Sequence, residues 1–252
     1  MTKSGILILA MIAGFINANA QSGNVPVSGN TLNVQTAVAV MGLDEIIAGY
    51  IKALGGKENL EKIKNVVMEG SLTVGGAEIQ VTITQVDKKL MRQDISAMGM
   101  IGYDFLTDKE GWTFMPFQGM QKPEPKTADE VKESQSDLDI AGPLFNYEAK
   151  GNKAELLGTE DVEGTTCNKI KVVLASGKEQ TYFIDVKSNL IVRLQEKRKF
   201  NGKEVELKSD FSDYKEVEGV KMPFSVSQAF GTVLFSSVKL NQTIDDKLYK
   251  HD

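Results

Sequence analysis

The sequence predicts a mainly β protein of the α+β class, built on one strongly curved antiparallel sheet. We expect an unclosed β-barrel of about 10–12 strands, with two or three helices covering its concave face. Three observations predict this. Short runs of alternating apolar and polar residues recur from Ala154 onward, with turn residues between them. No helical pattern separates these runs, which argues against parallel strands, and so large a sheet tends to curl.

The chain begins with the pattern of a cleavable secretory signal peptide over residues 1–20. Lys3 gives a positive start, Gly5–Ile16 is almost wholly apolar, and residues 18–20 have the small side chains of a cleavage site. An uncleaved anchor or a buried helix is the alternative, but the apolar run is shorter than the roughly 20 residues of a membrane span. No cysteine follows it directly, so we expect a periplasmic protein that is soluble, and not itself membrane-spanning, after cleavage.

Two helices are expected to open the mature chain. Residues 21–36 are rich in glycine, serine and asparagine, which predicts a flexible leader. Helical spacing of apolar residues then predicts a first helix from position 36 or 43 to Leu54, which Gly55 and Gly56 end. A short second helix is expected over 57–64. We expect residues 37–252 to form a single half-barrel domain.

After Asn65 apolar residues recur at every second position, which is typical of strands. Gly75 and Gly76 lie between two such runs and predict a hairpin turn. The strands expected in this first group are 67–74, 78–86, 89–97, 101–108 and 111–117.

Residues 122–139 interrupt the strands. Pro123 and Pro125 argue against an ordinary central strand. Thr127, with Glu130 three residues later, has the pattern of a capping box and predicts a polar helix to about Asp139. The strands expected after it are 154–162, 166–175, 179–186, 190–199, 204–216, 220–229 and 232–243.

The composition excludes several classes of function. The formal net charge is −5, which disfavours nucleic acid as a partner. The single histidine, His251, is the penultimate residue, so no zinc-protease motif, catalytic Ser-His-Asp triad or structured Cys-His pair is available. Glycine-rich nucleotide motifs are also missing from the sequence. We therefore expect no enzyme, no catalytic residue and no cofactor.

The remaining candidates for chemistry have simpler interpretations. Cys167, the only cysteine, is expected to be a small buried residue, with a reactive thiol as the alternative. The acidic runs 129–133 and 160–163 lack the spacing of a calcium-binding loop and predict solvated faces. We expect no metal site.

Methionines and aromatic residues concentrate between residues 91 and 120. Methionine adapts to variable apolar ligands, and a pocket for acyl chains needs apolar walls. Alternatively, these residues only pack the helices onto the sheet. The residues expected to line an apolar cavity are Met98, Met100, Phe105, Trp112, Phe114 and Phe117, with Ile47, Tyr50 and Leu54 of the first helix.

Several segments, in their order and spacing, resemble one family of exported proteins. They are Ile47–Gly56, Lys57–Val67, Gly142–Tyr147, Gly164–Val172, Thr181–Asp185, Leu190–Leu194 and Asp213–Phe224. The chain resembles the outer-membrane lipoprotein-sorting proteins of the LolA/LolB-like superfamily over roughly residues 43–240.

The resemblance implies an unclosed antiparallel barrel whose helices form a lid over an interior that receives acyl chains. The family's lipoprotein carriers also use an arginine of the sheet that latches the lid. The arginines of this chain are Arg92, Arg193 and Arg198, and none of them matches that position in the sequence. The function expected is a periplasmic carrier or chaperone that binds lipoprotein acyl chains or another lipid. The alternative is a non-enzymatic adaptor that binds envelope proteins and carries no lipid.

Overall fold

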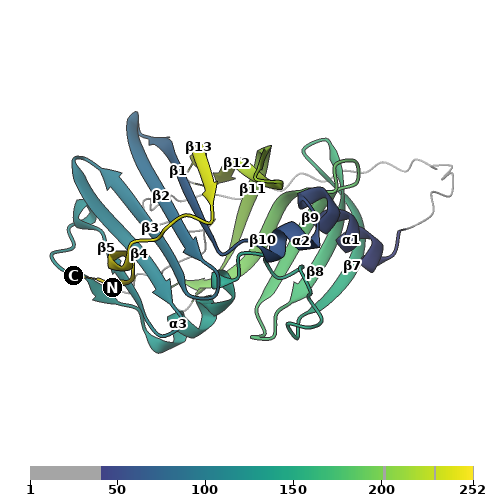
Figure 1. The fold of residues 1–252 in the computed structure, drawn as a ribbon, viewed down its shortest axis with the longest axis horizontal. Helices are drawn as coiled ribbons and strands as arrows, with labels where there is room; N and C mark the ends of the chain where they lie inside the picture. The colour runs from purple at the N-terminus through teal and green to yellow at the C-terminus, as the bar shows by residue number, and fades with distance from the viewer. Residues whose placement is uncertain (1–40, 201–202, 230, 252) are drawn as a thin grey trace.

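The computed structural model describes residues 41–200, 203–229 and 231–251. The signal peptide expected at 1–20 and the leader expected at 21–36 lie outside these residues. The described chain forms one 13-stranded antiparallel sheet (Figure 1). Its strands are β1 (Asn65–Val74), β2 (Ala77–Val86), β3 (Leu90–Ala97), β4 (Met100–Thr107), β5 (Gly111–Phe114), β6 (Glu124–Pro125), β7 (Lys153–Val162), β8 (Thr165–Val173), β9 (Glu179–Asp185), β10 (Ile191–Phe200), β11 (Lys203–Val217), β12 (Val220–Gln228) and β13 (Gly231–Leu240).

The sheet consists of two meanders that meet in its middle. The strand order is β6-β5-β4-β3-β2-β1-β13-β12-β11-β10-β9-β8-β7, so each strand except at the β1–β13 junction pairs with its neighbour in sequence. β6 and β7 form the two edges, and the sheet stays open. The predicted fold, a curved antiparallel sheet that does not close, is confirmed.

A bulge at Gly70 marks the junction of the two meanders. The register between β1 and β13 shifts between Glu69 and Gly70. A Cβ atom on Gly70 would lie 2.4 Å from the carbonyl oxygen of Leu234, so only glycine allows this close approach. Bulges increase local twist and bend the strand, which helps the sheet to curve here.

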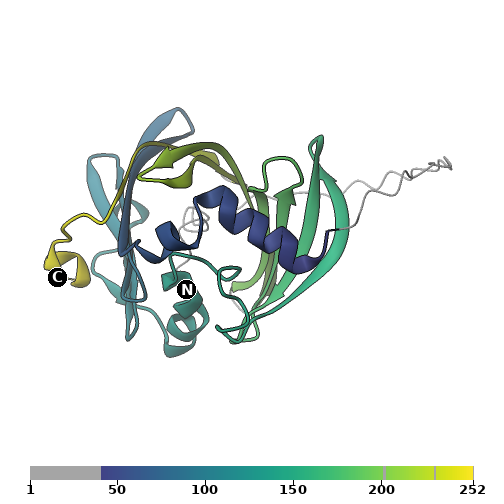
Figure 2. The same ribbon diagram turned by 45° about the vertical axis from the view of Figure 1, so that its right-hand side comes forward.

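Helices cover the concave face of the sheet, as Figure 2 shows for α1. Ile46 and Ile47 of α1 pack against strands β8–β10, whereas Leu60 and Ile63 pack against β1, β12 and β13. The helices are α1 (Leu43–Leu54), α2 (Lys57–Glu61), α3 (Ala128–Ser134) and the 3₁₀ turns η1 (Pro116–Gln118), η2 (Gln135–Leu138) and η3 (Asp246–Tyr249). Among the described residues, none of the helices has the length and apolar character needed to span a bilayer.

The junction of α1 and α2 is fixed to the turn between β11 and β12. Asn59 Nδ2 donates to the carbonyl oxygens of Gly55 (3.0 Å) and Gly219 (3.2 Å). Gly55 has φ +125°, and a Cβ atom there would lie 2.1 Å from the Gly219 oxygen. The predicted helix stop at this glycine therefore also sets where the end of α1 rests on the sheet.

Some predicted boundaries were wrong. The strand expected over 111–117 ends at Phe114, because Pro116 has no N–H to donate and begins η1. The helix expected over 127–139 is α for seven residues only and tightens into η2, although its predicted capping box at Thr127 and Glu130 is confirmed. The helix expected over 57–64 ends at Glu61. The two-residue edge strand β6 was not predicted.

Candidate functional site

A cavity of about 220 Å³ lies between the helices and the concave face of the sheet. α1, α2 and the segment 136–144 enclose it on the helical side, and β1, β2 and β9–β13 contribute the residues on the other. Most of its lining is apolar. Leu54 and Leu60 come from the helices, and Met68, Phe211 and Phe235 come from the sheet. Alternation along these strands brings every second apolar side chain to the concave face.

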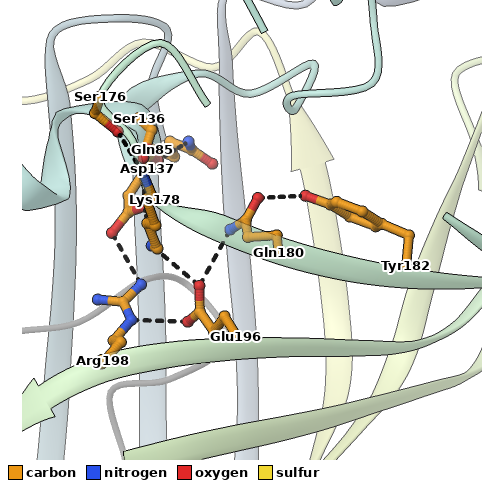
Figure 3. A network of polar contacts seen from close by, with 9 residues as sticks. All are labelled: Gln85, Ser136, Asp137, Ser176, Lys178, Gln180, Tyr182, Glu196 and Arg198. Carbon is orange, nitrogen blue, oxygen red and sulfur yellow. Dashed lines mark hydrogen bonds and ion pairs between the residues drawn. The ribbon is translucent and has the colours of Figure 1, made fainter. Parts of the chain in front are cut away.

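Four charged side chains form a buried network that borders the cavity (Figure 3). Arg198 Nη2 lies 3.2 Å from Asp137 Oδ2, and Arg198 Nε lies 2.7 Å from Glu196 Oε1. Lys178 Nζ lies 3.5 Å from Asp137 Oδ1 and 3.0 Å from Glu196 Oε2. The Asp137 and Glu196 side chains are only 2% and 5% exposed. Two cations and two anions balance, so the network carries no net charge.

The network joins the sheet to η2. Asp137 belongs to η2, whereas Glu196 and Arg198 belong to β10. Gln180 Nε2 donates to Glu196 Oε2 (3.1 Å), and Tyr182 Oη donates to Gln180 Oε1 (2.7 Å), which continues the network along the cavity wall.

Arg198 is the only one of the chain's three arginines that contacts η2, judged over the described residues. Arg92 Nη1 donates to the carbonyl oxygens of Leu248 (3.3 Å) and Lys250 (3.0 Å). Arg193 binds Asp210 and Glu163. Arg198 therefore links strand β10 to η2.

Burial and ion pairing act in opposite directions on the two carboxylates. Burial alone would raise the pKa of Glu196, but Arg198 and Lys178, with hydrogen bonds from Arg198 and Gln180, outweigh it and lower that pKa to about 2. For Asp137 burial is the larger influence and raises the pKa, although Arg198 and Lys178 offset part of it. The network thus lowers the pKa of Glu196 below its ordinary value, whereas it only partly offsets the effect of burial on Asp137.

Acidification should remove the contribution of Glu196 to stability. An acid whose pKa falls on folding stabilises the folded state above its ordinary pKa and loses that effect as the pH drops toward the folded value. For Glu196 this window runs from 4.5 down to about 2, and the loss is about 3 kcal/mol. Urea unfolding at several pH values should show a smaller acid-induced loss in Glu196→Gln than in the unmodified protein. Equal losses would contradict the assignment.

The structure brings two of the residues expected at the site to the cavity. Tyr50 and Leu54 of α1 line it. Ile47, on the same helix, is buried against β8–β10 and borders a separate shallow hollow between α1 and residues 144–147.

The residues expected from the strands do not line the cavity. Met98 occupies the turn between β3 and β4 with φ +54° and is 81% exposed, and Met100 is 38% exposed. Phe114 packs both at the edge of the large core and against Tyr103, with 5.9 Å between the two ring centroids. Phe117 packs at the edge of the large core.

Phe105 and Trp112 face away from the helices. Leu106, the neighbour of Phe105, packs against Leu138 of η2, so Phe105 points to the convex face. There it packs with Leu90 and Tyr103, and Leu248 and Tyr249 of the C-terminal segment cover the cluster. The Trp112 ring stacks on His251 with 3.7 Å between centroids.

Sequence reasoning missed most of the cavity wall. The missed residues come from α2, β1 and the C-terminal meander, and alternation in these strands was the signal that could have found them. They include Leu60, Met68, Tyr182, Phe211, Met222 and Phe235.

The described residues offer little for other chemistry. No group of three His, Cys, Asp or Glu side chains within them could hold a metal ion. Cys167 is fully buried with Val162 and Phe183, as expected, and burial raises the pKa of its thiol to about 11. The thiol is therefore protonated at neutral pH and unsuited to act as a nucleophile.

Comparison with known proteins identifies the fold. No protein-family model matches the sequence, and no curated protein matches it. The structure is similar to that of a LolA superfamily protein from Nitrosomonas europaea, with TM-score 0.51 and 12% identity over 81% of this chain and 96% of that one. This likeness confirms a LolA-like fold.

Two further structures are less similar. A putative outer membrane lipoprotein-sorting protein domain from Vibrio parahaemolyticus has TM-score 0.49 and 10% identity, over 80% of this chain and 94% of that one. A DUF1329 family protein from Desulfovibrio piger has TM-score 0.46 and 13% identity, over 83% of this chain and 97% of that one.

Proposed function

We propose that this chain, which has a LolA-like fold, is an exported carrier or chaperone. Its ligand is an acyl chain of a lipidated protein or of another lipid, enclosed between α1 and the sheet. The observation that carries the proposal is the apolar cavity of about 220 Å³ under α1. The mechanism is binding, without a chemical step, and Tyr50 and Leu54 are the contacts from the helix.

Burial of apolar surface supplies the binding energy. Each CH₂ group removed from water contributes about 0.8 kcal/mol, before the cost of ordering the chain. The apolar lining of the cavity suits an acyl chain. Because α1 covers the cavity, its movement would admit and release that chain.

Filling the cavity should weaken ligand binding while the fold persists. Ala141 is partly buried against the core and lines the cavity from the segment 136–144. Ala141→Trp is expected to weaken binding of an apolar fluorescent probe, such as N-phenyl-1-naphthylamine, by at least about tenfold, because the indole occupies the ligand's space. Ala141→Ser is the control and should bind normally. Equal probe affinities in the two folded variants would count against the cavity as the site.

Native mass spectrometry and lipid extraction of gently purified protein test the proposal directly. We expect a co-purified acyl lipid, and N-terminal sequencing of exported protein should begin at Gln21 if residues 1–20 are cleaved. A protein that retains no lipid and binds no apolar probe would refute the carrier function.

One observation favours the second candidate function, binding to another envelope protein. Met98 and Ile101 are 81% and 66% exposed at the hairpin between β3 and β4, and exposed apolar residues can mark contact surfaces. A partner that co-purifies with the protein, and is lost on Met98→Ser with Ile101→Ser, would support this function if the cavity proves empty.

A further inference from the structure

Three tyrosine side chains line the cavity from different elements. Tyr50 belongs to α1, Tyr182 to β9 and Tyr214 to β11. Tyr182 Oη donates to Gln180 Oε1 (2.7 Å), and Tyr214 Oη donates to the carbonyl oxygen of Ile191 (2.9 Å). These two hydroxyl protons are therefore engaged, while lone pairs on both oxygens stay free to accept a hydrogen bond.

Tyr50 differs from the other two. Its side chain is half-buried and lines the cavity, and its hydroxyl makes no hydrogen bond to any residue that the structure describes. Burial raises its pKa, so the phenol remains a neutral donor. Burial also raises the pKa values of Tyr182 and Tyr214, and interaction with Tyr50 adds to both shifts. A donor on the cavity wall that makes no hydrogen bond within the described protein is available to an oxygen atom of the ligand.

The charges on the cavity wall disfavour an ionised head group inside. Asp137 is paired with Lys178 and Arg198, and Asp139 is paired with Lys150. The remaining charged side chain on the wall is Lys221, which is exposed. A buried carboxylate or phosphate would therefore meet no free cation in the interior, and burial of an uncompensated charge is costly.

We propose that the cavity selects acyl ligands with an uncharged oxygen-containing head, and that Tyr50 determines this specificity. The Tyr50 hydroxyl donates to the carbonyl oxygen of an acyl ester, while Tyr182 and Tyr214 can accept from a neighbouring alcohol. The ligand class is a neutral glycerol ester and not an ionised fatty acid. This inference rests on the proposed carrier function and adds the chemistry of the head group.

Competition against bound N-phenyl-1-naphthylamine tests the inference, with monodecanoylglycerol and decanoate as ligands at about pH 8, where the acid is ionised. The unmodified protein should bind the ester more tightly than decanoate. Tyr50→Phe should weaken ester binding roughly three- to tenfold, the effect of one hydrogen bond. Tyr249→Phe, which removes a hydroxyl from the C-terminal segment on the convex face, is the matched control and should leave the ester affinity unchanged.

Two results would contradict the proposed selectivity for a neutral head group without contradicting the carrier function. One is equal ester affinity in Tyr50→Phe and the unmodified protein. The other is preferred binding of decanoate that Lys221→Gln removes, since it would place a charged head at the exposed edge. If the unmodified protein binds neither the naphthylamine nor either ligand, both proposals fail together.

Discussion

Replacing Arg198 by methionine is expected to lower the free energy of unfolding by about 3–5 kcal/mol, the usual cost of removing one partner from a buried ion pair. Methionine retains much of the apolar stem of arginine but none of its donors. Asp137 and Glu196, at 2% and 5% exposed, would then share the single cation Lys178. One buried negative charge would remain uncompensated.

Urea unfolding at neutral pH measures this loss, and an exposed ion pair provides the control. Lys57 and Glu61 lie 3.7 Å apart with side chains 62% and 49% exposed. Such pairs contribute at most about 1 kcal/mol, so Lys57→Met should change stability little. If Arg198→Met costs no more than Lys57→Met, the network does not stabilise the fold.

The loss should also appear locally, because the network helps to attach η2 to the sheet, together with hydrogen bonds from Gln85 to the Asp137 carbonyl and from Gln135 to the Thr107 carbonyl. Gln85 Nε2 donates to the carbonyl oxygen of Asp137 at 2.9 Å. In Arg198→Met only this contact and the ion pair with Lys178 remain to hold Asp137 to the strands. Amide hydrogen exchange in residues 135–138 should therefore accelerate more than exchange in β8 or β12.

The architecture could be predicted because its signals are local. Alternation in strands such as β8 and β13, glycine turns, and the capping box at Thr127 and Glu130 all depend on residues within a few positions of one another. The end of β5 was predicted wrongly because it depends on one nearby residue, Pro116, which begins η1. The strand β6 was missed because it forms only through pairing with β5. Edge strands of two residues leave almost no pattern to detect.

The buried network could not be predicted, because its partners meet only in the folded chain. Gln180 and Tyr182 alternate on one face of β9, and Leu194, Glu196 and Arg198 on one face of β10. The face thus changes from apolar to polar within each strand. A polar strand end usually predicts contact with solvent, and nothing in the local pattern indicates that Asp137, roughly forty to sixty residues earlier, covers it.

The methionine and aromatic cluster was informative about burial but not about which face is buried. Tyr103–Leu106 is buried on both sides, because Leu106 faces η2 and Phe105 faces the C-terminal segment. A run that is buried on both faces shows no alternation. The covering residues Leu248 and Tyr249 lie more than a hundred positions later, beyond the reach of periodicity arguments.

The placement of Phe105 can be tested by separating stability from ligand binding. Phe105→Ala is expected to lower the free energy of unfolding by about 3–5 kcal/mol, because a fully buried ring leaves a cavity among Leu90, Tyr103 and Leu248. Affinity for N-phenyl-1-naphthylamine should nevertheless stay unchanged in the folded variant, since the ring faces the convex side.

Phe235→Ala makes the same chemical change on the concave face. Phe235 is buried and lines the cavity, so this variant should lose comparable stability and also bind the naphthylamine several-fold more weakly. Both measurements require a temperature at which each variant is folded, which circular dichroism establishes. If Phe105→Ala weakened binding as much as Phe235→Ala, the ligand would contact β4, and the aromatic cluster rather than the space under α1 would be the binding site.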